Sequence, residues 1–365
     1  MTTPTAPPEA PTAAPIRLLT PALHQVASRL DRWRSASRRP FDRPERLRPH
    51  VGGRRYGWTH YGVMIPDLPD PHRFFMVMSF LGATGIRAFD NDHLVDGDAR
   101  ALATLHSGTA AATPHHYRGY RIGRDVEAAA DGSLVRFGDD LELRGRYPRV
   151  DLRARYADVE LDLRLEVSDR VSWFTRSPFY DHLSLLSTYE GEIRHRGERQ
   201  AVAGLCTYEH AASFGLHSVR RRAPIPPRWK LPLTLFTYQI VNLDPTTQLL
   251  LVDTRTIAGT LRRGAWIRSL DGSSRAYDDV DFTPAPDVPP RTLTDPLGRP
   301  MDVPERFRWT VRDGGRTLLE LDATLATPLH FGHGRGYTGG FDARVRWQGR
   351  ELERPGYLEY VDVGA

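Results

Sequence analysis

The stretch DVELDLRLEV, residues 158–167, alternates apolar and charged side chains without a break. Val159, Leu161, Leu163, Leu165 and Val167 occupy one face of an extended chain, and carboxylate and arginine side chains occupy the other. Strict alternation with period two is typical of a strand in an antiparallel sheet that has one face in water. This segment therefore predicts sheet structure with a solvated outer surface.

The same signal extends to both sides of this stretch. LRARY at 152–156 and FDARVRW at 341–347 alternate in the same way, and the change of register near Ala157 predicts a turn or bulge. Further strands are expected at 247–257 and 265–277, the second folded back by an Asp-Gly hairpin turn. No strand–helix alternation is visible, so the pattern disfavours a doubly wound parallel sheet and favours an antiparallel barrel or sandwich.

Length and composition narrow the class of protein. A chain of 365 residues with 40% hydrophobic residues has room for two domains. Its single cysteine excludes an internal disulfide. The formal net charge is only +5, because 45 acidic residues nearly balance 50 lysines and arginines. This balance argues against a nucleic-acid partner. No apolar run approaches the roughly 20 residues needed to cross a membrane, and no signal peptide is recognisable, so a cytoplasmic location is expected.

The N-terminal region differs from the rest. Residues 1–15 are rich in Pro, Ala and Thr and are expected to form a disordered tail. Within 21–39, the residues Leu23, Val26, Leu30 and Trp33 form one helical face among many arginines. Such a basic amphipathic helix can dock on its own domain or lie on an anionic membrane, which makes a peripheral membrane contact a candidate. Residues 16–50 are therefore predicted to form this helix and a Pro-rich linker.

The cysteine lies in LCTYEHA, close to an acid and a base. If this stretch is a strand, Cys206 and His210 share a face but stand ~13 Å apart, too far for a nucleophile–base pair. We therefore interpret Cys206 as a small buried hydrophobic residue. Glu209 and His210 remain candidates for function, because the residues around them are mostly apolar.

Two motifs are interpreted as structural. GRGYTG at 334–339 matches a dinucleotide-binding pattern, but a strand rather than a helix follows it, so we predict a flexible turn. The pairs His115–His116 and His330–His333 lack a third nearby ligand in the sequence. We therefore expect no metal site and no cofactor.

Two further segments can contribute to a binding site. The acidic stretch at 88–98 is typical of a loop, from which Asp90 can enter a pocket. The aromatic, Met-rich stretch at 56–82 is explained by core packing or by the wall of an apolar pocket.

The second half of the chain resembles a known family through three segments in order. They are YEGEIRHRGERQAVAGLCTYEHA at 189–211, FTYQIVNLDPTTQLLLVDTR at 236–255 and YTGGFDARVRWQGRELERPGYLEYVDV at 337–363. These segments resemble successive signatures of the lipocalin-like carotenoid 1,2-hydratases and AttH-type proteins, which are related to the lipocalin-like Diels–Alderases. The resemblance covers about residues 186–363, and GWTHYGVMI at 57–65 adds a looser match in the first half.

This resemblance implies two tandem calycin-like barrels with a ligand cavity at or between them. It places Glu209, where the family has Asp, and His210 on the acidic and basic positions of a strand that opens the second domain. Matches to other positions of the family motifs fall on Tyr208, Phe236, Tyr238, Tyr357, Glu359 and Tyr360.

The fold prediction is all-β, with two tandem lipocalin-like antiparallel β-barrels and a short N-terminal helix. The predicted domains are 51–200 and 201–365. The predicted function is binding of a hydrophobic isoprenoid, polyene or polyketide-like lipid, with hydration or cyclisation assisted by a buried acid. Two alternatives stay open: a non-catalytic carrier or sensor of lipophilic molecules, and a structural or partner-binding protein.

The candidate residues follow from these arguments. Catalytic candidates are Glu209, Tyr208, His210, Asp90 and His60. Ligand-binding candidates are Trp58, Tyr61, Phe236, Tyr238, Tyr337 and Tyr357.

Overall fold

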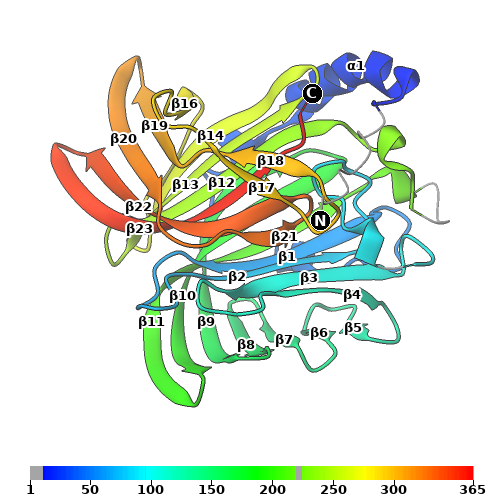
Figure 1. Cartoon of the computed structure of the whole chain (residues 1–365), viewed down its shortest axis with the longest axis horizontal. Coiled ribbons are helices and arrows are strands. Elements are labelled where there is room, and N and C mark those ends of the chain that lie inside the picture. Colours follow the sequence, from blue (N-terminus) through cyan, green and yellow to red (C-terminus); the bar gives the residue numbers. More distant parts are fainter. Residues whose placement is uncertain (1–10, 95, 219–223, 365) are drawn as a thin grey trace, which may run out of the picture.

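The computed structural model describes residues 11–94, 96–218 and 224–364, and this part of the chain is almost entirely β (Figure 1). Its helical segments are α1 (Ala14–Leu30), α2 (Trp33–Ala36) and four short 3-10 helices, η1 (Pro44–Leu47), η2 (Asp92–Leu94), η3 (Leu216–Ser218) and η4 (Pro227–Trp229).

The first sheet has 11 strands in the order β4-β3-β2-β1-β11-β10-β9-β8-β7-β6-β5. Its strands are β1 (Trp58–Ile65), β2 (Phe75–Leu81), β3 (Leu102–Thr109), β4 (His116–Arg121), β5 (Val126–Ala128), β6 (Leu134–Phe137), β7 (Leu141–Arg146), β8 (Arg149–Arg155), β9 (Val159–Arg176), β10 (Tyr180–His195) and β11 (Glu198–Ser213).

The second sheet has 10 strands, in the order β15-β14-β13-β12-β23-β22-β20-β19-β16 with β21 beside β22. Its strands are β12 (Leu233–Asn242), β13 (Thr247–Thr256), β14 (Gly259–Ser269), β15 (Ser274–Tyr277), β16 (Val280–Pro284), β19 (Arg306–Asp313), β20 (Arg316–Leu325), β21 (His330–His333), β22 (Gly336–Trp347) and β23 (Arg350–Asp362). A separate hairpin joins β17 (Arg291–Thr294) to β18 (Pro300–Val303).

Both large sheets are antiparallel and curl into nearly closed barrels, and in Figure 1 the first barrel lies below the second. The predicted fold, two tandem lipocalin-like barrels preceded by a helix, is therefore confirmed. Local predictions hold as well. β8 ends at Arg155 and β9 begins at Val159, which places a turn at Ala157, and Gly272 turns the β14–β15 hairpin with φ of 111°. Gly334, with φ of 60°, lies in the turn between β21 and β22, where the glycine-rich motif was expected to be a turn.

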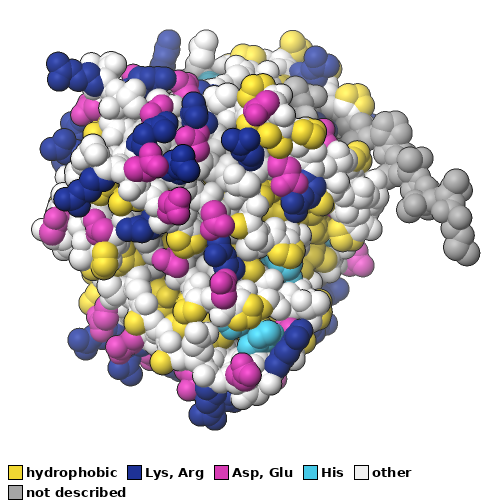
Figure 2. All heavy atoms as spheres, turned by 60° about the vertical axis from the view of Figure 1, so that its left-hand side comes forward, with side chains coloured by type: hydrophobic (Ala, Val, Ile, Leu, Met, Phe, Trp, Pro, Cys, Tyr) yellow, Lys and Arg dark blue, Asp and Glu magenta, His cyan; other side chains and the backbone are white. Residues whose placement is uncertain are grey.

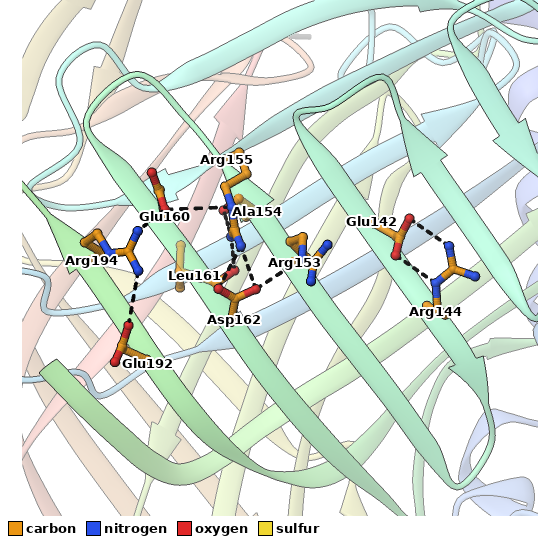
Figure 3. A network of polar contacts seen from close by, with 10 residues as sticks. All are labelled: Glu142, Arg144, Arg153, Ala154, Arg155, Glu160, Leu161, Asp162, Glu192 and Arg194. Atoms are coloured by element: carbon orange, nitrogen blue, oxygen red, sulfur yellow. Dashed lines mark hydrogen bonds and ion pairs between the residues drawn. The ribbon is translucent and has the colours of Figure 1, made fainter. Parts of the chain in front are cut away.

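β9 shows why the alternating sequence forms this wall. Its apolar residues from Val159 to Val167 are buried, and the side chains between them are exposed or half-buried. The outward side chains pair across strands, as where Arg155 Nη2 donates to both carboxylate oxygens of Asp162 (Figure 3). Each exposed pair contributes at most about 1 kcal/mol, so burial of the inner face stabilises the barrel more than these ion pairs do.

The surface carries both signs of charge. On the face in Figure 2, basic and acidic side chains are interspersed rather than separated into one basic region. Among the described residues, no helix is long and apolar enough to cross a membrane.

The strand at the junction of the two halves differs from the expectation. Tyr208, Glu209 and His210 were expected to open the second domain, but β11 lies between β1 and β10 in the first sheet. The second sheet begins with β12 at Leu233. β11 nevertheless contacts the second sheet, because Tyr238 of β12 donates a hydrogen bond to Glu209.

The N-terminal helix also begins earlier than expected. Ala14 and Pro15 belong to α1 rather than to a disordered tail, while residues 1–10 lie outside the described part. The predicted helical face is divided between two helices. Trp33 of α2 is buried, whereas Leu23, Val26 and Leu30 of α1 are exposed.

Candidate active site between the two barrels

A small internal cavity lies where the outer walls of the two barrels meet. Its lining comes from β1, β2, β10 and β11 of the first sheet, from β12, β21 and β23 of the second, and from the loop after β2. The lining residues are Trp58, His60, Met78, Phe80, Phe89, Tyr180, His182, Glu209, Ala211, Phe236, Tyr238, His333 and Glu359. The space open to the centre of a water molecule is about 20 Å³, which is room for about one water.

Glu209 is the acidic group that the first barrel contributes. β11 turns its side chain toward β12, where the Tyr238 hydroxyl donates a hydrogen bond of 2.6 Å to Oε1. Complete burial raises the pKa of Glu209 to about 6, while hydrogen bonds from Tyr238 and Ser184 and the positive charge of Arg268 oppose that rise. At neutral pH this carboxylate is therefore mostly ionised and buried.

Arg268 supplies positive charge that stabilises the ionised form of Glu209. The side chain reaches from β14 between the sheets and donates to the Ser184 carbonyl at 2.6 Å and to Gln248 Oε1 at 2.8 Å. Burial lowers the pKa of Arg268 to about 10, so the guanidinium stays charged at neutral pH. It is fixed by its hydrogen bonds and acts on Glu209 through the electrostatic field.

Glu359, on β23, is the acidic group from the second barrel. Its Oε1 accepts a hydrogen bond of 3.0 Å from the Tyr357 hydroxyl, and its Oε2 lies 3.3 Å from His333 Nε2. Burial, followed by repulsion from Glu209, raises the pKa of Glu359 well above its usual value. Arg268 is not among the groups that act on Glu359, so the two carboxyl groups have different environments. Glu359 holds its proton more firmly, and Glu209 loses its proton first.

The histidines of the cavity are neutral. Burial lowers the pKa of His60 to about 4 and that of His333 to about 3, and it lowers the pKa of His182 well below its usual value. His60 Nδ1 contacts the Ser79 carbonyl at 2.9 Å, and His182 Nδ1 contacts the Tyr180 hydroxyl at 3.0 Å. These imidazoles offer lone pairs and N–H groups to a ligand without adding positive charge.

In the described part of the chain, three residues of this cavity form a group with metal-ligand chemistry: His60, His182 and Glu209. One donor atom each from His60, His182 and Glu209 lies within 4.8 Å of the other two. Buried His182 Nε2 has no hydrogen-bond partner among the described residues. Two imidazoles and a carboxylate are a donor set that divalent transition metals accept. The sequence did not indicate this set, because its members lie on three different strands.

The sequence-predicted histidine pairs have other surroundings. His115 stacks on His330 with ring centroids 4.1 Å apart and lies 2.9 Å from His106 Nε2 through its Nδ1. His116 contacts the Tyr120 hydroxyl at 2.8 Å. His333, in contrast, belongs to the cavity described above.

The predicted site residues fall into two groups. Trp58, His60, Glu209, Phe236 and Tyr238 line the cavity, and Tyr357 borders it through its bond to Glu359. Tyr61, Tyr208, His210, Asp90 and Tyr337 do not line it.

The second group has specific structural contacts instead. The Tyr61 hydroxyl donates to the Leu47 carbonyl at 2.6 Å, and His210 Nε2 contacts the Arg48 carbonyl at 2.9 Å. Asp90 forms an ion pair of 2.6 Å with buried Lys230. Tyr208 is buried, and the ring of Tyr337 packs on Phe331. Tyr208 and His210 lie on the opposite face of β11 from Glu209, because side chains alternate along a strand.

Sequence reasoning missed four residues of the cavity that carry polar groups, one of which is Tyr180. Glu359 was noted as part of the closing strand but not as a site residue, His333 was considered only for metal, and His182 was not considered. The signal for Glu359 was the same as for Glu209, since each is a single acidic residue within an apolar strand segment.

Solved structures with this fold agree with the resemblance found in the sequence. The chain superposes on an AttH-type protein from Nitrosomonas europaea with a TM-score of 0.59 and 15% identity, covering 88% of this chain and 97% of the other. Kievitone hydratase from Nectria haematococca gives 0.54 and 10%, covering 98% and 97%. CghA in complex with Sch210972 gives 0.51 and 8%, covering 85% and 89%. No curated protein matches the sequence.

These likenesses define the fold class: a double-barrel protein with the lipocalin-like fold that the AttH-type protein, kievitone hydratase and CghA share. Within that class, the chain belongs to the Family of unknown function (DUF6670), whose pattern matches residues 78–365.

Proposed function

We propose that the protein hydrates or cyclises an unsaturated hydrophobic molecule of isoprenoid, polyene or polyketide type in the cavity between the barrels. The observation that carries the proposal is the carboxyl pair, Glu209 and Glu359, buried in one aromatic cavity with pKa values pushed apart. Two carboxyl groups with separated pKa values supply an acid and a base at the same pH.

The two carboxyl groups have different roles, one as the acid and the other as the base. The sequence suggested Glu209 or Asp90 as the proton donor, but Glu359 keeps its proton to higher pH than Glu209 and is the better donor in this cavity. In hydration, Glu359 donates a proton to one alkene carbon, a water oxygen bonds to the other, and Glu209 takes the proton that this water loses. The acidic proton of Glu359 is then restored from solvent as Glu209 releases its own. In cyclisation, the second alkene carbon bonds instead to a carbon of another double bond in the same molecule, and Glu209 takes a proton from the carbon next to the resulting cation, so that a double bond re-forms and the product is an isomer.

The other side chains suit such a reaction. Rings of Phe89 and Phe236 pack at 5.1 Å, and Phe80 and Trp58 pack at 5.7 Å. This apolar surface excludes bulk water, and its π faces stabilise positive charge that develops on carbon. Ligand pockets usually occupy about 300–1,000 Å³, so substrate binding requires these rings to move apart.

The fold neighbours are compatible with this proposal and do not carry it. One of them is named a hydratase, and another was solved with a bound small molecule. A shared fold does not transfer an activity, whereas the carboxyl pair is a feature of this chain.

Mass spectrometry of lipophilic molecules that copurify with the full chain tests the proposal. Wild type and Glu359→Gln are compared, with Glu351→Gln as control, because Glu351 lies on the same strand with a side chain that is 55% exposed. We expect Glu359→Gln to retain unreacted substrate. Wild type and control should hold a product that is heavier by one water, or an isomer of equal mass with a different retention time.

The same experiment distinguishes an enzyme from a non-catalytic carrier or sensor. The protein is a carrier or sensor if all three proteins hold the same unmodified molecule. In that case, the same molecule added to the purified protein is also released chemically unchanged. A reacting enzyme should lose activity below about pH 6, where Glu209 gains a proton.

A further inference from the structure

Helix α1 turns its apolar face away from the protein. Leu18, Leu19, Leu23, Val26 and Leu30 are 80%, 56%, 53%, 49% and 40% exposed. Their spacing places all five along one side of the helix, and Ala22 lies between them. The side toward the barrels carries Thr20, which is the buried residue of the helix. A surface helix normally shows the reverse arrangement, so this exposed stripe requires a partner.

The charge around the stripe limits what that partner is. Residues 14–39 contain six arginines and one acidic residue. The acidic residue, Asp31, is engaged by Arg262, and Arg34 is paired with Asp278, so the other five arginines set the positive charge of residues 14–39. Arg29 follows Leu18 by about three helical turns and therefore lies at the edge of the stripe. An anionic partner complements this surface.

A second copy of the chain fits poorly. Two copies that joined their stripes around a twofold axis would bring the same arginines against each other. Like charges at such a contact are unfavourable, and the apolar stripe is only one helix wide. An anionic lipid surface meets both requirements, because it offers phosphate groups next to an apolar layer.

The ends of the helix lie beside other exposed aromatic side chains. Ala13 N–H donates to the Arg228 carbonyl, next to Trp229, which is 37% exposed. At the other end, Arg32 N–H donates to the Arg176 carbonyl, three residues before Phe179, which is 55% exposed. Trp and Phe side chains are favourable at a bilayer interface.

This end of the molecule is also close to the cavity. Tyr180, directly after Phe179, lines the cavity and packs on Trp58 with ring centroids 5.7 Å apart.

We propose that α1 is a membrane-docking helix, which places its leucine stripe at the boundary of headgroups and acyl chains of an anionic bilayer while Arg29 and the arginines that follow the helix contact lipid phosphates. The helix is about 25 Å long and would lie parallel to the membrane surface. The proposal does not depend on the chemistry of the carboxyl pair.

Vesicle flotation of the full chain tests the proposal. The probes are vesicles of phosphatidylcholine alone and vesicles with about 30% phosphatidylglycerol. We expect stronger binding to the anionic vesicles, and weaker binding as salt is raised. The double change Leu19→Glu/Leu23→Glu should weaken binding at least about tenfold, because two apolar contacts with the bilayer are lost. Arg29→Gln should weaken binding to the anionic vesicles alone, by about fivefold.

Leu297→Glu is the matched control, since Leu297 is 44% exposed and lies outside α1. It should bind as wild type does, and thermal unfolding of all variants should be unchanged because each side chain is exposed. Failure of wild type to float with anionic vesicles overturns the proposal. So does a lipid-free dimer that Leu19→Glu/Leu23→Glu separates into monomers. Glu209→Gln should still bind vesicles, which keeps this test separate from the test of catalysis.

Discussion

Replacing Glu209 by Gln should stabilise the protein in a pH-dependent manner. Burial holds the folded-state pKa of Glu209 at about 6, against a usual value of 4.5. Between these values the folded state binds more protons than the unfolded state, so the contribution of Glu209 to stability falls as pH rises through this window. Above pH 6 the ionised, buried carboxylate of Glu209 lowers the free energy of unfolding by its full amount, about 2 kcal/mol near pH 8. This net value already includes the attraction of Arg268.

The neutral amide avoids that cost while keeping an oxygen for the Tyr238 hydroxyl. We expect Glu209→Gln to raise the free energy of unfolding by about 2 kcal/mol near pH 8 and by about 1 kcal/mol near pH 5. Urea unfolding at both pH values measures the difference. Glu190→Gln is the control, since the Glu190 side chain is 72% exposed and should show no such pH dependence.

The difference between the two pH values is the informative quantity, because any packing change caused by the amide affects both measurements equally. A gain that is equal at both pH values, or a loss that grows with pH, would refute a buried carboxylate with a raised pKa. A pH-dependent gain accompanied by loss of turnover would indicate that the fold gives up stability to keep an ionised base in the cavity.

Three further predictions follow from other buried groups. The pKa values of His60 (about 4) and His333 (about 3) lie below the usual 6.5, so each should remove stability as pH falls below 6.5, by about 1.4 kcal/mol per pH unit; thermal unfolding at pH 7 and pH 5 measures this loss. Burial raises the pKa of the Cys206 thiol, so a thiol reagent should label it only in denaturant, and labelling of the native protein would contradict its buried position. Lys230→Met leaves Asp90 buried without its ion pair and should cost about 3–5 kcal/mol in urea unfolding, whereas an unchanged midpoint would show that water reaches this carboxylate.

Much of the fold could be predicted from the sequence because its signals are local. The alternation of 158–167 fixes which side chains of β9 face the barrel interior, and Asp271-Gly272 marks the β14–β15 turn. Sheet membership is different. β11 follows β10 by a hairpin and pairs with β1 from the distant start of the chain, which no local pattern reveals.

The candidate site was predicted in part for the same reason. Glu209 and Tyr238 were identified through family-like motifs, and they lie 2.6 Å apart in the structure. Tyr208 and His210 were included with Glu209 because they are adjacent in sequence, yet neighbours along a strand point to opposite faces. Asp90 was correctly placed in a loop region, but its ion pair with Lys230 joins segments 140 residues apart.

The sequence by itself determined that this chain consists of antiparallel strands, because side-chain alternation and turn residues act over a few neighbouring positions, and two tandem barrels were implied by its resemblance to a known family. Only the tertiary structure decided that Glu209 of one barrel and Glu359 of the other share a cavity. The raised pKa values also depend on that meeting, since desolvation arises when the two outer walls pack together. The same holds for α1, whose apolar stripe is visible in the sequence but whose outward direction is set by packing against the barrels.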